Sequence, residues 1–130
     1  MPVAEGLPCY YCYKPNKTEL FDSALIKQSD IECFDWENQI LKLNECGMQK
    51  TKGLKIPLQG LAVAITIDKE PIYGFWLWNY YSSFGCDWVC AYPELGFKIQ
   101  FGLPTGYAKG KDPRFVKRIE DYLIKTRLKK

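Results

Sequence analysis

The sequence predicts an α+β fold in which an antiparallel sheet of four or five strands carries a C-terminal amphipathic helix, packed on one face. Three observations lead to this prediction: an apolar run at residues 61–67, a polar turn at 68–71 followed by a second strand pattern, and a helical periodicity after residue 112. Strands grouped before a terminal helix are typical of α+β architecture.

A first hairpin is expected near the N-terminal third of the chain. Ile31, Cys33 and Phe34 lead into a polar turn at 35–38, and a short apolar strand follows at 40–43. The next segment begins with Asn44, a residue type that caps helices, but it contains two glycines and a proline. We therefore expect a helix of one or two turns there.

The run "LAVAITI" at 61–67 is nearly continuous and rich in branched residues, which is typical of a central strand that is covered on both faces. The polar residues 68–71 then allow a hairpin, so "IYGFWLW" should return as the next antiparallel strand. Alternation places Ile72, Gly74, Trp76 and Trp78 on one face of that strand, and Tyr73, Phe75 and Leu77 on the other.

Two further strands are expected at 87–92 and 95–102, where Phe97, Ile99 and Phe101 alternate with polar residues. Asp112 is then the predicted N-cap of the last helix, with Pro113 at its first position. The residues that trace one face of this helix are Phe115, Val116, Ile119, Tyr122, Leu123 and Thr126.

Length and composition predict one domain, residues 1–130, and exclude several activities. Histidine is absent, which excludes Ser–His–Asp triads, Cys–His pairs and imidazole metal ligands. No phosphate-binding glycine loop occurs, so no cofactor is expected. A net charge of +3 is too small to indicate a nucleic-acid partner.

The most unusual feature is the aromatic stretch between Pro71 and Pro93, which carries one charge, Asp87. Its polar residues and bounding prolines argue against a membrane span. Most of its rings should be core. One helix cannot cover both faces of such a sheet, so we expect part of the aromatic face to be exposed or covered by the N-terminal region. Exposed aromatic rings mark binding surfaces, and the candidate ligand-binding residues are Tyr80, Tyr81, Phe84 and Trp88.

Six cysteines indicate an oxidising compartment. Cys9-x2-Cys12 and Cys86-x3-Cys90 could form a four-thiolate zinc site, a thiol redox site, or disulfides that tie the N-terminal segment to the aromatic region. Spacing does not choose between these. Cys33 and Cys46 could be buried thiols.

Four acidic residues cluster near the first hairpin: Asp30, Glu32, Asp35 and Glu37. Two carboxylates in a cleft could act as a catalytic pair, but a solvated strand or turn explains this pattern. Asp87 is the acid whose pKa burial among aromatic rings could raise, although the sequence shows no partner for it.

The segments "SDIECFDWENQILKLNE" (29–45) and "GLAVAITIDKEPIYGFWLWNYYSS" (60–83) follow a recognisable order. A segment that begins with Asp-Ile is followed by a strand, a short helix, an apolar strand, a turn and a further strand. This order is similar to that of the periplasmic head region of the translocase subunit SecD. The resemblance implies an extracytoplasmic domain that acts without catalysis.

Together these patterns predict a non-enzymatic extracytoplasmic protein, periplasmic or secreted, that binds a protein or other ligand. As written, the chain is expected to be a mature segment that lacks its signal. The alternatives are a cysteine-based zinc or thiol redox protein, and an inhibitor or immunity-type protein that binds through another surface.

Overall fold

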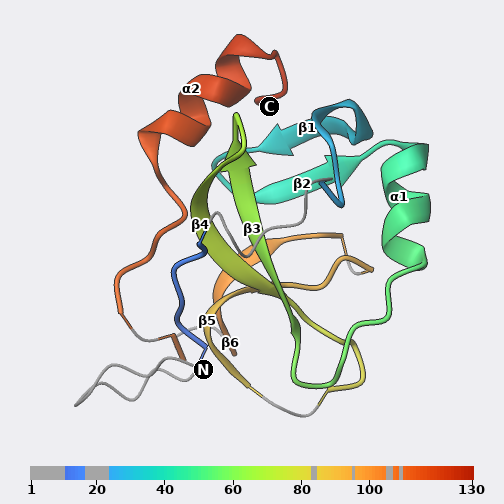
Figure 1. The fold of residues 1–130 in the computed structure, drawn as a ribbon, viewed down its shortest axis with the longest axis vertical. Helices are drawn as coiled ribbons and strands as arrows, with labels where there is room; N and C mark the ends of the chain where they lie inside the picture. The colour runs from blue at the N-terminus through green and yellow to red at the C-terminus, as the bar shows by residue number, and fades with distance from the viewer. Residues whose placement is uncertain (1–10, 17–23, 83–84, 95, 105–106, 109) are drawn as a thin grey trace.

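The computed structural model describes residues 11–16, 24–82, 85–94, 96–104, 107–108 and 110–130, and it confirms the α+β class. Figure 1 shows the elements in order: η2 (Gln28–Asp30, a 3-10 helix), β1 (Ile31–Asp35), β2 (Ile40–Leu43), α1 (Glu45–Lys52), β3 (Leu61–Ile67), β4 (Glu70–Leu77), β5 (Cys86–Ala91), β6 (Ile99–Leu103) and α2 (Lys117–Lys125). In the described part of the chain, β1 and β2 form one sheet, and β3-β4-β5-β6 form a second in that order.

The hairpin β1–β2 is confirmed, with Phe34 opposite Leu41 and Asp35 opposite Ile40. The short helix α1 is confirmed as well. Its predicted cap, Asn44, accepts a hydrogen bond from the Gly47 backbone N–H at 3.0 Å, which satisfies one of the free donors in the first turn.

The hairpin β3–β4 is also confirmed as antiparallel, with Val63 opposite Phe75. Its turn consists of Asp68 and Lys69, with φ angles of 52° and 66°. Two successive left-handed residues suit the right-handed twist of the flanking strands. The predicted central position of β3 is wrong, because β3 stands at one end of the strand order and exposes Ala62.

The prediction of a wholly antiparallel sheet is wrong, because β4 and β5 run parallel. They pair only near their C-terminal ends, where Trp76 lies opposite Cys90 and Leu77 opposite Ala91. β5 begins at Cys86, about 13 Å along the strand before Cys90, which is its first residue paired with β4. The connection over residues 78–85 can extend over about 26 Å, so it is long enough to bring the chain back to the start of β5.

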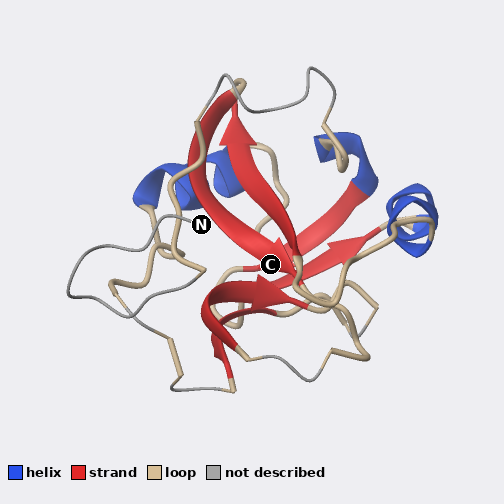
Figure 2. Cartoon of the chain, turned by 60° about the horizontal axis from the view of Figure 1, so that its bottom comes forward, coloured by secondary structure: helices blue, strands red, loops and turns tan. Residues whose placement is uncertain are grey.

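Hydrogen bonds outside the two sheets join them into one structure. The Leu41 N–H donates to the Phe97 carbonyl at 3.1 Å, and the Ile99 N–H donates to the Gln39 carbonyl at 2.8 Å. The C-terminal residues run alongside β1, where the Phe34 N–H donates to the Leu128 carbonyl at 2.7 Å. The two α-helices lie apart on the outside of the strands (Figure 2).

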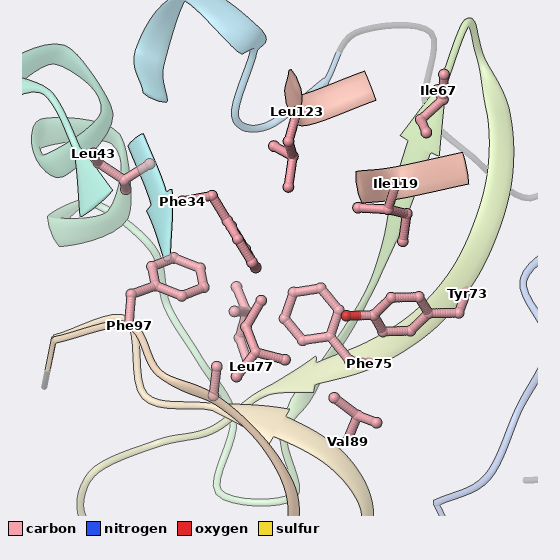
Figure 3. Packing of buried hydrophobic residues seen from close by; sticks show 12 residues of the cluster. Phe34, Leu43, Ile67, Tyr73, Phe75, Leu77, Val89, Phe97, Ile119 and Leu123 are labelled. Atoms are coloured by element: carbon pink, nitrogen blue, oxygen red, sulfur yellow. The ribbon is translucent and has the colours of Figure 1, made fainter. Parts of the chain in front are cut away.

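The main core fills the space between these strands and α2. Figure 3 shows Phe34, Phe75, Leu77 and Phe97 pointing toward one another. The buried members of this cluster are Phe34, Leu43, Ile67, Tyr73, Phe75, Leu77, Val89, Ala91, Phe97, Ile99, Ile119 and Leu123. The alternation predicted for β4 is therefore confirmed for its face of Tyr73, Phe75 and Leu77.

The C-terminal helix begins later than predicted. Its N-cap is Val116, and Asp112 and Pro113 precede the helix. Asp112 instead accepts hydrogen bonds from the guanidinium of Arg114, with Nη2 to Oδ2 at 2.8 Å. Ile119 and Leu123 of α2 are buried, whereas Phe115 lies outside the helix and is half exposed against the ring of Trp36.

The opposite face of β4 is covered by residues 11–13. This is one of the two outcomes expected for the aromatic face, because one helix cannot cover both faces of the sheet. The ring of Tyr11 contacts those of Trp76 and Trp78 edge-on, with centroids 4.9 Å and 5.1 Å away. The indole N–H of Trp76 donates to the Tyr11 carbonyl at 2.9 Å. A second buried cluster results, containing Tyr11, Trp78, Cys86 and Cys90.

Among the described residues, no helix has the length and apolar character needed to cross a bilayer.

Candidate functional site

The parallel pairing of β4 and β5 places the residues that follow the two strands beside each other. The Trp78 N–H extends the pairing by donating to the Ala91 carbonyl at 2.8 Å. Carboxyl ends of parallel strands meet at one edge of a sheet, and loops that leave such an edge often form ligand sites. Here the two loops are residues 78–82 and 92–94.

Asn79 fixes the conformation of the first loop. Its side-chain N–H donates to the Ile56 carbonyl at 2.6 Å, and its Oδ1 accepts from the Tyr81 N–H at 2.8 Å. The Ser82 hydroxyl donates to the Leu58 carbonyl at 2.7 Å. These bonds attach the loop to the connection between α1 and β3, which lies next to it in Figure 1. The loop is therefore held by hydrogen bonds at Asn79 and Ser82.

This anchored loop displays two tyrosines to solvent. Tyr80 is 56% exposed and Tyr81 is 85% exposed, and their rings meet edge-on with centroids 5.4 Å apart. They border a pocket of about 120 Å³, which is lined by Ile56, Trp78, Asn79, Tyr80, Tyr81, Tyr92 and Glu94. Two of the four predicted ligand-binding residues, Tyr80 and Tyr81, thus lie at one described pocket.

The structure separates Trp88 from the two tyrosines. Trp88 does not line the pocket. Its indole N–H donates to the Gly74 carbonyl at 2.9 Å, and its ring packs edge-on against Phe101 with centroids 5.8 Å apart. These contacts make Trp88 part of the packing of the sheet. The fourth candidate, Phe84, lies outside the described residues.

Tyr92 and Glu94 line the pocket but were not predicted as site residues. An antiparallel β5 would have carried them away from Tyr80, so the sequence pattern provided no signal to group them. Burial is the main cause that raises the pKa of the Tyr92 hydroxyl above its usual value. Smaller contributions come from the neighbouring Cys90, Cys86 and Tyr80. Tyr92 therefore contributes an uncharged polar group to the pocket.

One of the three alternatives for the cysteines, a disulfide between the N-terminal pair and Cys86 or Cys90, is wrong. Cys86 and Cys90 are fully buried free thiols, so neither is joined to the N-terminal pair. Cys12 is disulfide-bonded, but not to any of the free cysteines, which are Cys33, Cys46, Cys86 and Cys90. Cys9 lies outside the described residues. Among the residues that the structure places, no group of three or more potential metal ligands comes together.

The acidic residues of the first hairpin have structural partners. Asp30 is buried and accepts from Lys50 Nζ at 2.6 Å, and Asp35 accepts from the Asn38 side chain at 2.9 Å. These hydrogen bonds are the largest influences on each carboxyl and lower the pKa of both. Glu32 lies 3.6 Å from Lys42 Nζ. These contacts agree with a structural role for Asp30, Glu32 and Asp35.

Asp87, for which the sequence shows no partner, is buried and accepts a hydrogen bond from the Tyr11 backbone N–H at 2.8 Å. This contact helps to attach the N-terminal segment to β5.

Comparisons with family models, curated proteins and solved structures found no match, so the function proposed below rests on the geometry of this chain.

Proposed function

We propose that this protein is a small, non-catalytic binding protein whose ligand occupies the pocket between residues 78–81 and 92–94. The observation that carries the proposal is the exposure of Tyr80 and Tyr81 on a hydrogen-bonded loop beside that pocket. Tyrosine offers a rigid apolar ring with a polar tip, which suits contact with peptides, sugars and other partly polar ligands. Location outside the cytoplasm is part of the proposal; because Cys33, Cys46, Cys86 and Cys90 are free, it rests on the disulfide of Cys12 and on the resemblance.

The anchoring by Asn79 supports binding in a further way. A loop that is already ordered loses little conformational entropy when a ligand arrives, so more of the contact energy contributes to affinity. The two hydrogen bonds of the Asn79 side chain and the bond from Ser82 to Leu58 provide this order. The exposed side chain of Leu58, whose carbonyl accepts from Ser82, adds apolar surface next to this loop.

The test is a fragment screen observed on the ¹⁵N-labelled protein by NMR. We expect hits to shift the amide signals of Ile56, Asn79, Tyr80 and Glu94 together, since all four residues line the pocket. Tyr81→Ser should weaken these hits several-fold. The matched control is Tyr107→Ser, because Tyr107 is 50% exposed and does not line the pocket.

Two results would overturn the proposal. The first is a set of hits that map to other surfaces and leave the pocket signals unchanged. The second is a Tyr81→Ser variant that binds pocket-directed hits as tightly as the wild type does. Both variants change exposed side chains, so we expect both to fold.

A further inference from the structure

The pocket beside Tyr80 combines aromatic rings with a single kind of charge. Four of its seven lining residues are aromatic: Trp78, Tyr80, Tyr81 and Tyr92. Among the described residues that line it, Glu94 carries a carboxylate and none is a lysine or arginine. Glu94 makes no ion pair with any residue that the structure describes. The site therefore presents negative charge and aromatic surface together.

We propose that this pocket binds an organic ammonium group, either a quaternary ammonium or the protonated end of a lysine side chain. The inference rests on the proposed binding function and specifies its ligand class. Aromatic rings carry partial negative charge on their faces and attract cations, and a nearby carboxylate strengthens this attraction. The same carboxylate disfavours phosphate, sulfate and carboxylate ligands by repulsion.

The uncharged state of Tyr92 is consistent with this assignment. A tyrosine is uncharged near neutral pH, and burial raises the pKa of the Tyr92 hydroxyl further, so Tyr92 does not add a second negative charge. Glu94 is then the charged side chain of the lining, and its exposure leaves the carboxylate accessible to a ligand. One carboxylate matches one ammonium group in charge.

The volume of the pocket limits the size of the bound group. About 120 Å³ is slightly smaller than an engineered cavity of roughly 150 Å³ that accepts benzene. A trimethylammonium group or the end of a lysine side chain is of this size, whereas a whole sugar ring with its hydroxyls is larger. The pocket should therefore hold one headgroup, with the remainder of the ligand lying over Tyr81 and Leu58.

The experiment compares two probes of the same shape, choline and its neutral isostere 3,3-dimethylbutan-1-ol, by NMR titration of the ¹⁵N-labelled protein. We expect choline to shift the signals of the pocket residues and to bind on the order of tenfold more tightly than the neutral alcohol. Glu94→Gln and Tyr80→Leu should each weaken choline binding several-fold. Tyr107→Leu, a change at an exposed tyrosine outside the pocket, should leave it unchanged.

A short peptide with a central trimethyllysine, and the same peptide with lysine, distinguish the two sources of the ammonium group. Tighter binding of either peptide than of choline assigns the pocket to a protein ligand. Tighter binding of choline assigns it to a small quaternary ammonium compound. Either result supports recognition of an ammonium group.

Equal or tighter binding of the neutral alcohol would overturn the ammonium proposal but leave the proposed binding function intact, because the pocket would then select apolar shape alone. Absence of pocket shifts with all four probes would also overturn it. In that case the fragment screen separately decides whether the pocket binds any ligand.

Discussion

The ring of Tyr13 lies directly against the Cα of Gly74, in the middle of β4. A Cβ added at Gly74 would lie 2.2 Å from Cζ of Tyr13, well inside any permissible contact. The Tyr13 hydroxyl donates to the Val63 carbonyl and lies 3.1 Å from the Phe75 carbonyl oxygen. Glycine at position 74 therefore lets the N-terminal segment dock on the sheet.

Replacement of Gly74 by alanine should destabilise the protein by about 1–3 kcal/mol, because the new methyl group must displace the Tyr13 ring. Urea unfolding followed by tryptophan fluorescence measures this change. Tyr13→Ala removes the ring, so the cost of Gly74→Ala should be much smaller in that background. This non-additivity identifies the Tyr13 contact as the cause.

Gly53→Ala is the matched control, since a Cβ there would contact nothing closer than 3.8 Å. We expect its free energy of unfolding to stay within about 0.5 kcal/mol of the wild-type value. Equal costs of Gly74→Ala with and without the Tyr13 ring would contradict the steric explanation.

The contribution of Asp30 to stability should depend on pH. Hydrogen bonds from Lys50 Nζ and the Lys27 N–H hold the pKa of the Asp30 carboxyl below its ordinary value of 3.8. Because the folded-state pKa lies below that of the unfolded chain, the stabilisation is fully present above the unfolded value. It is lost as the pH falls through the folded-state value.

We therefore expect Asp30→Asn to destabilise the protein at pH 6 and to have a smaller effect below the ordinary aspartate pKa. Urea unfolding of both proteins at pH 6, 4 and 3 measures the difference. Asp121→Asn serves as the control, because Asp121 forms a solvent-exposed pair with Lys117. A cost of Asp30→Asn that stays constant over this pH range would show that the ion pair is not its origin.

Arg114 holds the segment before α2 against β6. Its guanidinium donates to both oxygens of Asp112, and its Nη1 donates to the Ile99 carbonyl at 2.9 Å. Burial alone would raise the pKa of Asp112, but the hydrogen bonds from Arg114 outweigh it and lower that pKa.

Lysine has a single ammonium group and cannot make these bonds together, so Arg114→Lys should cost about 1–3 kcal/mol in thermal or urea unfolding. Arg118→Lys is the control: Arg118 pairs with Glu70 at the surface, and its replacement should cost less than about 1 kcal/mol. Similar costs for the two variants would mean that the bidentate geometry at Arg114 adds nothing.

The free thiols should differ strongly in reactivity. Cys46 is exposed, whereas Cys86 and Cys90 are fully buried. The hydrogen bond with Cys86 and the burial of the site raise the pKa of the Cys90 thiol, which keeps it in the unreactive protonated form. Maleimide labelling with peptide mapping should modify Cys46 within minutes and reach Cys86 and Cys90 only on unfolding. Early modification of Cys90 in the native protein would contradict this burial.

Several local features were predictable because the residues that determine them are close in the sequence. The cap at Asn44 depends on Gly47 three residues later, and the turn at Asp68 and Lys69 lies between its own two strands. The start of α2 was predicted wrongly for the opposite reason. Asp112 has the chemistry of a cap, but Arg114 and the Ile99 carbonyl bind that segment to β6 instead.

The sequence by itself therefore determined the α+β class, both hairpins and the exposed tyrosines as a candidate binding surface. Only the tertiary structure decided that β5 runs parallel to β4 and that Tyr80, Tyr81, Tyr92 and Glu94 line one pocket. The physical reason is the sequence separation of the contacts involved, because hairpins and caps depend on residues that are neighbours in the sequence. The direction and partner of a strand depend instead on contacts between distant segments, and here Trp78 and Cys90 share a buried cluster with Tyr11.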